Sequence, residues 1–421
     1  MRMFIFNEIL TYQFYTKYKS KSFQTDKLTG GIIVNIRHPR ILIMTAGYGE
    51  GHLQVSHALK QGFLSKEIYS LHIVDLMKEA HPILNSVSSK LYQMSTYSSQ
   101  FGLDYYGWSY YMTRDTNPIG SVNRYLNAIG KRKILEMIEN ARPDAIINTF
   151  PFGAVTETSR NFSIPTSTVI TDYTLHSRWI HPDTDKYYVA TEALESELIR
   201  DHGTAPDRIC VTGIPVRAAF YHTATAATMF SPAEPRMARN RVLIMAGSFA
   251  VFHHIVELVQ MLLEKGNCDI DLVCGRHDKM VMKLRSLFAD RLDVNVLGYV
   301  EQMHELMAAS SCIVTKAGGV TLSEALVLKL PVFIFKPYGG QERENAQFFQ
   351  QNGLADIAYD TRELGEKMIH FLHDPAASER IRNKMASMDR GEAAKLIIED
   401  TLLMIDERQR LRGLPLFAVR K

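Results

Sequence analysis

Residues 312–349 decide the fold, and they read CIVTKAGGVTLSEALVLKLPVFIFKPYGGQERENAQFF. The stretch opens with a β-branched run, turns at a pair of glycines, and continues into a helical pattern from about Val320. A second apolar run, Val332–Phe335, is followed by another glycine turn and a polar helix start. Strand, helix, strand and helix in this order are typical of the βα units that build a parallel sheet. We therefore expect an α/β fold built on parallel sheets.

The same alternation extends over the chain from Arg40 in two series. In the first series the predicted strands are Ile41–Thr45, Leu71–Val74, Ala145–Asn148, Thr166–Ile170, Tyr187–Val189 and Ile209–Thr212. In the second series they are the run VLIMA after Arg241, Ile270–Cys274, Val294–Leu297, Ile313–Thr315, Val332–Phe335 and Ala355–Ala358. Two series of this kind predict two sheets, each with its own helices.

Between the two series the alternation lapses. Residues 218–240 are rich in Ala, Thr, Pro and small polar residues without a convincing helical period, which indicates a linker. The expected organisation is an N-terminal extension that is a candidate for disorder, a first domain, a linker, and a second domain whose last helices pack back over the domains. The corresponding ranges are 1–39, 40–218, 219–240 and 241–421.

Composition limits the class of protein. With 421 residues, 46% hydrophobic and 22% charged, the chain can bury a core and divide into two or three domains. The net charge is +3, but residues 1–40 carry seven Lys/Arg against Glu8 and Asp26, so the other 381 residues sum to −2. A basic balance that comes from the leading segment gives no reason to expect a nucleic-acid partner.

Cysteines and apolar runs indicate the compartment. Four cysteines without CxxC spacing suit a reducing, cytoplasmic interior. No apolar run of the sequence approaches the ~18 to 20 residues that span a bilayer, so any membrane contact is expected to be peripheral. Residues 1–40 lack an apolar signal-peptide core, so we do not expect export.

A glycine-rich loop follows the first predicted strand, within RILIMTAGYGEGHLQVSHALKQGF. Its glycines are Gly47, Gly49 and Gly51. His52 stands at the strand-to-helix turn, where ligands collect in such sheets. A near-neutral imidazole at a helix start is suited to take a proton from an incoming hydroxyl. Two other interpretations stay open: a dinucleotide site with Asp75 as its acidic residue, and a surface histidine that caps a turn.

The turns of the fold-deciding stretch suggest a site for a nucleotide diphosphate. Gly318 and Gly319 precede a helix whose free N–H groups and dipole attract an anion. Glu324, within the first turn and a half of that helix, is suited to accept two hydroxyl protons from a ribose. The next helix starts with polar groups that suit sugar hydroxyls, those of Gln341, Glu342 and Asn345. Helix capping is the alternative for Gln341 and Asn345.

Two further turns are weaker candidates for nucleotide contacts. Gly247 and Ser248 follow the strand VLIMA as a possible phosphate loop that is poor in glycine. Tyr299 and Val300 follow another strand and could hold a base by stacking and backbone hydrogen bonds, although a buried core tyrosine is a competing interpretation. Thr321 completes the set of donor-binding candidates.

Nine ordered blocks resemble the diacylglycerol glucosyltransferase and monogalactosyldiacylglycerol synthase family, relatives of the glycosyltransferase that makes lipid II. They are TAGYGEGH, IINTFPF, VITDYTLHSRW, DKYYVAT, VTGIPVR, LIMAG, VLGYVEQ, TKAGGVTLSEA and KPYGGQERENA. The resemblance covers the chain from about Arg40 to the C-terminus. It implies a GT-B architecture, in which two Rossmann-like domains face each other across a cleft and the C-terminal one holds most of the sugar nucleotide. It also implies anomeric inversion without a cofactor or metal, with a UDP-sugar as the donor substrate.

The resemblance suggests roles for single residues. His52 matches the family's proposed base, which would deprotonate the acceptor hydroxyl. Glu324 matches the ribose-binding glutamate, and Gln341 and Glu342 match positions beside the donor sugar. Arg217, in GIPVR, matches an arginine near the diphosphate, where a fixed cation would stabilise the departing charge.

The resemblance also bears on Asp172, on the loop after Met245 and on the roles of the two domains. Asp172, in TDYTLH, is a catalytic candidate by motif position, expected to orient His52 or the acceptor. The loop GSFAVFHH stands where many family members carry a glycine-richer loop. On the family pattern, residues 40–218 would form the acceptor and membrane domain, and residues 241–421 the nucleotide-sugar domain.

Residues 92–111 contain eight aromatics, a much higher density than the 10% of the whole chain. Amphipathic rings such as Tyr106 and Trp108, beside cations such as Arg114 and Arg124, suit a surface that meets anionic headgroups and admits a lipid acceptor. Two loop glycines are assigned to the same acceptor side, Gly49 and Gly51. The alternative is a core helix with its aromatics inward and a solvated basic face.

The leading hypothesis is transfer of glucose from UDP-glucose to 1,2-diacylglycerol with inversion, repeated on the glycolipid product, to make glycolipid of the lipoteichoic acid anchor type. The expected partners are a UDP-sugar, diacylglycerol and glycolipid acceptors, and an anionic membrane surface at the cytoplasmic face of the cell membrane, with no nucleic acid. Galactose transfer stays open because Gln341 and Glu342 do not settle an epimeric hydroxyl. A UDP-sugar 2-epimerase and a nucleotide-sugar-sensing regulator are alternatives of other classes.

Overall fold

The computed structural model describes residues 38–47, 50–80, 105–114, 130–229, 239–249 and 251–411. The expectation for the N-terminal extension therefore lies almost wholly outside the described residues. Within the described ranges, the side chains of residues 105, 106, 108, 109, 113 and 227–229 are also not described.

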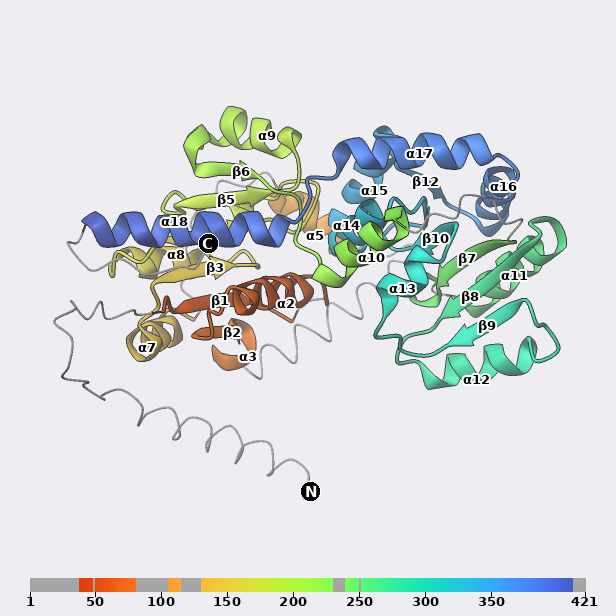
Figure 1. The fold of residues 1–421 in the computed structure, drawn as a ribbon, viewed down its shortest axis with the longest axis horizontal. Coiled ribbons are helices and arrows are strands. Elements are labelled where there is room, and N and C mark those ends of the chain that lie inside the picture. Colours follow the sequence, from red (N-terminus) through yellow and green to blue (C-terminus); the bar gives the residue numbers. More distant parts are fainter. Residues whose placement is uncertain are drawn as a thin grey trace, which may run out of the picture. The chain divides into compact units, whose positions relative to one another are not determined.

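Six parallel strands form the first sheet, in the order β2-β1-β3-β4-β5-β6 (Figure 1). They are β1 (Ile41–Thr45), β2 (Leu71–Asp75), β3 (Ala145–Asn148), β4 (Thr166–Val169), β5 (Lys186–Val189) and β6 (Ile209–Val211). Every residue of β1, β3 and β4 is buried, as expected for central parallel strands covered on both faces. The strand order reverses between β1 and β3, which makes a crevice at their carboxyl ends the expected place for a ligand.

The second sheet also has six parallel strands, in the order β12-β11-β10-β7-β8-β9. They are β7 (Asn240–Met245), β8 (Cys268–Val273), β9 (Val294–Leu297), β10 (Cys312–Thr315), β11 (Val332–Phe335) and β12 (Ala355–Ala358). Its order reverses between β7 and β10. All twelve strands predicted from the sequence are present, with ends that differ by at most two residues, and the α/β fold class is confirmed.

Helices connect and cover the strands of both sheets (Figure 1). Those that follow the strands of the first sheet are α2 (Glu50–Ser65), α3 (Leu76–Ala80), α5 (Tyr105–Arg114), α7 (Lys131–Ala141), α8 (Gly153–Arg160), η2 (Ser177–Trp179), α9 (Glu192–His202), η3 (Pro206–Arg208) and α10 (Ala218–Met229). In the second half they are η4 (Ala246–Ser248), α11 (Phe252–Lys265), α12 (Asp278–Leu287), α13 (Met303–Ala308), α14 (Gly319–Leu328), α15 (Gln341–Gln351), α16 (Thr361–Leu372), α17 (Pro375–Met388) and α18 (Ala393–Leu411). In the part of the chain that the structure describes, no helix has the length and apolarity needed to cross a bilayer.

The last helix of the chain, α18, packs against α2 of the first half. A Cβ on Gly62 of α2 would lie only 2.4 Å from Cδ1 of Ile398, so glycine lets the two helices approach closely. Lys66 and Glu399 form an ion pair at 3.2 Å along the same contact. The two ends of the described fold are therefore held together by packing.

The predicted linker, 219–240, begins with a regular helix. Helix α10 packs against α13 and α14, and its own Phe220 is fully buried. The hydroxyl of Tyr221 donates to the carbonyl of Gly391 at 2.7 Å. The sequence shows little periodicity here because alanine and threonine, which make up most of the helix, have small side chains of similar polarity.

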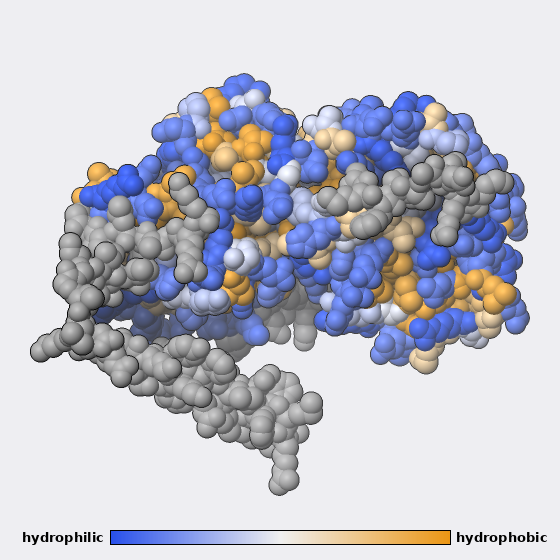
Figure 2. Space-filling view, viewed as in Figure 1, coloured by the Kyte–Doolittle hydropathy of each residue, from blue (hydrophilic) through white to orange (hydrophobic). Residues whose placement is uncertain are grey.

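One apolar cluster contains buried residues of both sheets. Tyr173, on the loop after β4, stacks on Phe348 of α15 with ring centroids 5.3 Å apart and meets Phe349 edge-on at 4.8 Å. Its hydroxyl lies 2.8 Å from Oγ of Ser323 on α14. These contacts fix the loops of the first sheet against the helices of the second. On the face drawn in Figure 2, hydrophilic residues predominate and apolar ones form separate patches.

Candidate active site

His52 lies in the first turn of α2, and its ring is held by the loops after β3 and β4. Nδ1 lies 2.8 Å from the carbonyl oxygen of Thr149 and 3.1 Å from Oγ1 of Thr171. A carbonyl only accepts hydrogen bonds, so Nδ1 carries the proton and Nε2 carries the lone pair. No described residue hydrogen-bonds Nε2. The imidazole is thus presented as a base.

The surroundings of His52 keep it neutral. Burial lowers the pKa of His52 to about 4, and the hydrogen bond to Thr149 opposes this only in part. The ring meets Phe150 edge-on at 5.1 Å and lies 6.0 Å from the ring of Trp179, both measured between centroids. Near pH 7 the side chain is therefore in the form that accepts a proton.

Asp172 lies one residue beyond Thr171, but its carboxylate does not contact His52. Oδ1 accepts a hydrogen bond from Nδ2 of Asn345 at 3.0 Å, and burial raises the pKa of Asp172 to about 6. The sequence suggested that Asp172 orients His52 or the acceptor; in the structure the hydrogen-bond partners of His52 are Thr149 and Thr171.

Asn345 joins the two halves instead of facing an open space. Its Oδ1 accepts from the backbone N–H of Tyr173 at 2.8 Å, and Nδ2 donates to Asp172 and to the carbonyl of Ala317 at 3.1 Å. The side chain is fully buried. Both amide hydrogens are used, so this conformation cannot donate to the sugar hydroxyl that the sequence suggested.

The two glycines at the start of α14 have different surroundings. A Cβ on Gly319 would lie 2.1 Å from the carbonyl oxygen of Thr171, so this residue permits a close approach between the β4 loop and the helix. A Cβ on Gly318 would meet nothing within 4 Å. A Cβ on Gly51, beside His52, would lie 3.5 Å from Cγ2 of Val320. The loop that carries His52 is therefore adjacent to the N-terminus of α14.

Arg217 and Glu324, both predicted to contact the donor, contact each other. Nη2 of Arg217 lies 3.7 Å from Oε1 of Glu324, and Nη1 donates to the carbonyl of Glu301 at 3.3 Å. Burial raises the pKa of Glu324 to about 7, against the opposing effect of Arg217. Nε of Arg217 is buried without a hydrogen-bond partner in the described structure. The guanidinium of Arg217, from the first half, and the carboxylate of Glu324, from the second half, therefore lie side by side, and the guanidinium can donate a further hydrogen bond.

Glu342 also has a carboxylate oxygen that could accept a further hydrogen bond. Its Oε2 is buried and, in the described part of the chain, has no hydrogen-bond partner. Burial raises the pKa of Glu342, Lys316 lowers it, and Asp172 raises it. Lys316, on the loop after β10, was not predicted; its ammonium lies 4.8 Å from the ring centroid of Tyr338. Two half-buried residues, Gln341 and Thr321, lie in the first turns of α15 and α14.

The weaker donor candidates lie on the β7 and β9 loops. Gly247 is exposed, and a Cβ there would meet nothing within 4 Å. Oγ of Ser248 is buried without a hydrogen-bond partner among the described residues. Tyr299 is 55% exposed with Arg276 over its ring at 4.5 Å, so it is not a core tyrosine. Val300 packs against the core cluster.

The residues predicted for the acceptor side are described only in part. Gly49 and Arg124 lie outside the described residues, as do the side chains of Tyr106 and Trp108 on α5. Arg114 forms an ion pair with Glu344 of α15. The sequence alone did not identify Glu344, because QERENA offers several polar residues and only packing shows which of them are buried.

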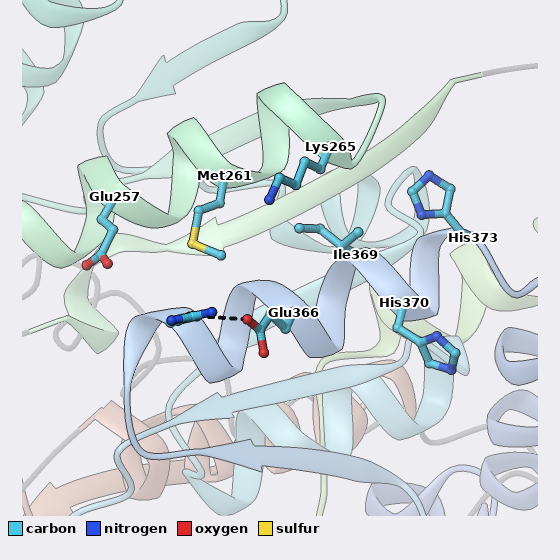
Figure 3. Close-up of a pocket in the computed structure, with 8 residues that line it drawn as sticks. Glu257, Met261, Lys265, Glu366, Ile369, His370 and His373 are labelled. Atoms are coloured by element: carbon cyan, nitrogen blue, oxygen red, sulfur yellow. Dashed lines mark hydrogen bonds and ion pairs between the residues drawn. The ribbon is translucent and has the colours of Figure 1, made fainter.

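A separate groove lies between α11 and α16, with charged and apolar side chains from both helices along it (Figure 3). It is lined by Glu257, Met261, Lys265, Arg362, Glu366, Ile369, His370 and His373. None of the predicted site residues is among them, so the groove is distinct from the candidate active site. Among the residues that the structure describes, no group of three or more His, Cys, Asp or Glu side chains has metal-site geometry.

Solved structures share the fold at low identity. The UDP-GlcNAc 2-epimerase of Neisseria meningitidis, solved bound to UDP-GlcNAc, has a TM-score of 0.56 at 15% identity, covering 86% of this chain and 100% of that one. MurG of Acinetobacter baumannii has a TM-score of 0.51 at 13% identity, covering 88% and 99%. These similarities show the GT-B fold that the resemblance implied.

Sequence comparisons identify the family. The monogalactosyldiacylglycerol (MGDG) synthase family matches residues 52–216, and the glycosyltransferase family 28 C-terminal domain matches residues 241–401. The processive diacylglycerol beta-glucosyltransferase of Bacillus cytotoxicus is 34% identical over 367 residues, 86% of this chain and 93% of the relative. That of Bacillus cereus is 35% identical over 370 residues, 87% and 94%. The chain is therefore a glycosyltransferase, and it belongs to the family of the processive diacylglycerol beta-glucosyltransferases.

Proposed function

We propose that this enzyme transfers glucose from UDP-glucose to 1,2-diacylglycerol with inversion and repeats the transfer on its glycolipid product. The observation that carries the proposal is the neutral His52, held through Nδ1 by Thr149, on a turn that lies beside the N-terminus of α14. Relatives at 34% and 35% identity, matched over most of both chains, bear the name of this activity.

In the proposed reaction, Nε2 of His52 takes the proton of the acceptor hydroxyl as its oxygen attacks C1 of the sugar. The C1–O bond to the diphosphate breaks, and UDP leaves with the electron pair. Attack from the side opposite the leaving group inverts the anomeric carbon. A base with a pKa of about 4 is weak, but the negative charge that develops on the nearby diphosphate would stabilise the imidazolium.

The donor would lie at the carboxyl ends of β7 and β10. The free N–H groups of α14 and the guanidinium of Arg217 would bind the diphosphate, with Glu324 released to the ribose hydroxyls. The orphan oxygens of Ser248 and Glu342 would gain partners from the nucleotide and the sugar. No step in this proposal uses a cofactor.

The test is product identification. The purified protein is incubated with diacylglycerol and UDP-glucose, UDP-galactose or UDP-GlcNAc, and the lipids are analysed by mass spectrometry and by the anomeric coupling constant in NMR. The proposal predicts β-linked glucolipids with one and then more hexoses, formed from UDP-glucose. Products from UDP-galactose alone would instead favour the galactose-transferring alternative, and epimerisation of the donor without diacylglycerol would favour an epimerase.

The acceptor requires contact with a membrane, which we propose is peripheral, at the cytoplasmic face. The support is the aromatic and basic segment around α5, although Arg114 is already paired with Glu344. Binding to vesicles that contain an anionic lipid should weaken when Tyr106 and Trp108 become Ala, or when salt is raised. If binding is unchanged in both experiments, this segment is not the membrane-binding surface.

A further inference from the structure

Glu344 is a buried carboxylate that holds α5 against α15. Its side chain is 7% exposed. The hydroxyl of Tyr110 donates to Oε2 at 3.1 Å, and the guanidinium of Arg114 pairs with Oε1. Both partners lie on α5, four residues apart and so on the same face of the helix. A carboxylate that accepts from two groups of one helix fixes both the position and the rotation of that helix.

The other contacts of α5 lead to the base. The ring of Tyr110 meets that of His176 at 4.8 Å, edge-on. His176 caps η2 by accepting from the N–H of Arg178 at 3.1 Å, and η2 ends at Trp179, whose ring lies beside His52. Helix α5 therefore touches the segment that packs on the base.

Glu344 also lies close in sequence to residues that were predicted to bind the donor. It lies in the first turn of α15, two residues after Glu342, which with Gln341 was predicted to contact the donor sugar. The same turn is fixed to the β4 loop through Asn345. A displacement of α5 would therefore disturb the residues that pack on His52. Helix α15 would stay in place, because Asn345 holds it to the β4 loop independently of α5.

We propose that Glu344 is a positioning residue, which clamps α5 to the donor-side helix α15 and so forms the wall of the acceptor subsite beside His52. The assignment of this subsite to the acceptor rests on the proposed function. Because Asn345 holds α15 independently, loss of the clamp should loosen the acceptor side while leaving the nucleotide side in place.

The first test is steady-state kinetics on full-length Glu344→Gln, which keeps the size of the side chain and removes its charge. We expect the KM for diacylglycerol in mixed micelles to rise about tenfold, with the KM for the UDP-sugar changed by less than about twofold. Glu366→Gln, which breaks the exposed Arg362–Glu366 pair of α16 at 2.9 Å, is the matched control and should change neither KM. Equal changes in both constants, or no change in either, would overturn the proposal.

A double-mutant cycle asks whether Arg114 acts through Glu344. Arg114→Gln should raise the acceptor KM as Glu344→Gln does, and the double variant should be no worse than either single one, because both changes break the same pair. Multiplicative effects of the two changes would show that Arg114 and Glu344 act separately and would contradict a clamp.

A measurement without substrate separates failure of the clamp from failure of the proposed function. The chain has two tryptophans, Trp108 on α5 and Trp179 beside His52, so its fluorescence reports on this region. Acrylamide quenching should increase in Glu344→Gln and stay at the wild-type value in Glu366→Gln. Unchanged quenching in Glu344→Gln would contradict the clamp even if the enzyme proved to use another acceptor.

Discussion

The two sheets each have one crevice where the strand order reverses, and the two crevices are filled differently. Between β1 and β3, the imidazole of His52 occupies the crevice and donates to the carbonyl of Thr149 on the facing loop. Between β7 and β10, Oγ of Ser248 is buried without a described partner, and Gly247 and Gly318 have open space where a Cβ would be.

The difference suggests that the same type of parallel sheet is used for proton transfer in the first half and for ligand binding in the second. Buried polar atoms without a described partner occur at both places, Oγ1 of Thr45 and Oδ1 of Asn148 at the ends of β1 and β3 and Oγ of Ser248 after β7, so they do not distinguish the two crevices. The open space beside Gly247 and Gly318 is what gives the second crevice the character of a binding site. The first crevice supplies its own hydrogen-bond partner to Nδ1 and leaves a single basic nitrogen, which is the character of a site prepared for proton transfer. The changes at His52, Glu324 and Ser248 below each affect one crevice and should leave the other intact, whereas Gly319→Ala changes the contact between the two halves.

Removal of the base should have the largest effect. His52→Ala should lower kcat by about a thousandfold, while the affinity for UDP, measured by calorimetry, stays within about twofold. His57→Ala, at an exposed position of the same helix, is the control and should keep wild-type turnover. If His52→Ala remains active, His52 is not the base.

The next largest effect should come from Gly319→Ala, because it disturbs the contact between the β4 loop and α14. Gly319→Ala would place a Cβ 2.1 Å from the carbonyl of Thr171, so the β4 loop or α14 must move. We expect a loss of about 2 kcal/mol in the free energy of unfolding, measured with urea. Gly247→Ala, with open space at its Cβ, should change it by less than about 0.5 kcal/mol. Equal stability of both variants would mean that the halves do not approach as described.

The pH dependence of UDP binding tests the second crevice alone. The pKa of Glu324 is raised to about 7, so the carboxylate takes up a proton as the pH falls through 7 and loses charge for the ribose hydroxyls and for Arg217. UDP should bind about tenfold more weakly at pH 6 than at pH 8. Glu324→Gln should bind weakly at both and reduce this difference; an unaltered pH profile would exclude Glu324 as its source.

The smallest expected effect concerns Ser248. Because its Oγ has no described partner in the absence of ligand, Ser248→Ala should leave the free energy of unfolding unchanged or slightly higher. The Kd for UDP should rise about threefold through loss of one hydrogen bond. A loss of stability without any loss of affinity would show that the hydroxyl serves the fold and not the nucleotide.

The fold could be predicted from sequence because its strands are short, buried and β-branched, and glycines mark their ends. The pattern failed over α10, where alanine and threonine dominate and apolar and polar faces are hard to distinguish. His52 could be selected as a candidate because it directly follows a glycine loop. Its partner Thr149 could not, because the two residues are 97 positions apart and only the sheet order brings them together.

Three residues have partners that the sequence did not predict. Gly319 and Asn345 were selected for contacts with the donor; the structure shows in addition that Gly319 admits the carbonyl of Thr171, and it shows Asn345 bound to Asp172 and Tyr173. Glu344 was not selected at all. In each case the sequence shows a residue suited to a polar contact, and tertiary packing decides which polar partner it receives.

A crystal structure of the protein with UDP would locate the nucleotide directly. We expect UDP at the carboxyl ends of β7 and β10, with its diphosphate at the N-terminus of α14, the ribose hydroxyls on Glu324, and Arg217 moved from Glu324 to the phosphates. His52 should keep its bond to Thr149 and face the terminal phosphate. UDP bound instead in the crevice between β1 and β3, with the second crevice empty, would contradict the assignment of the two crevices.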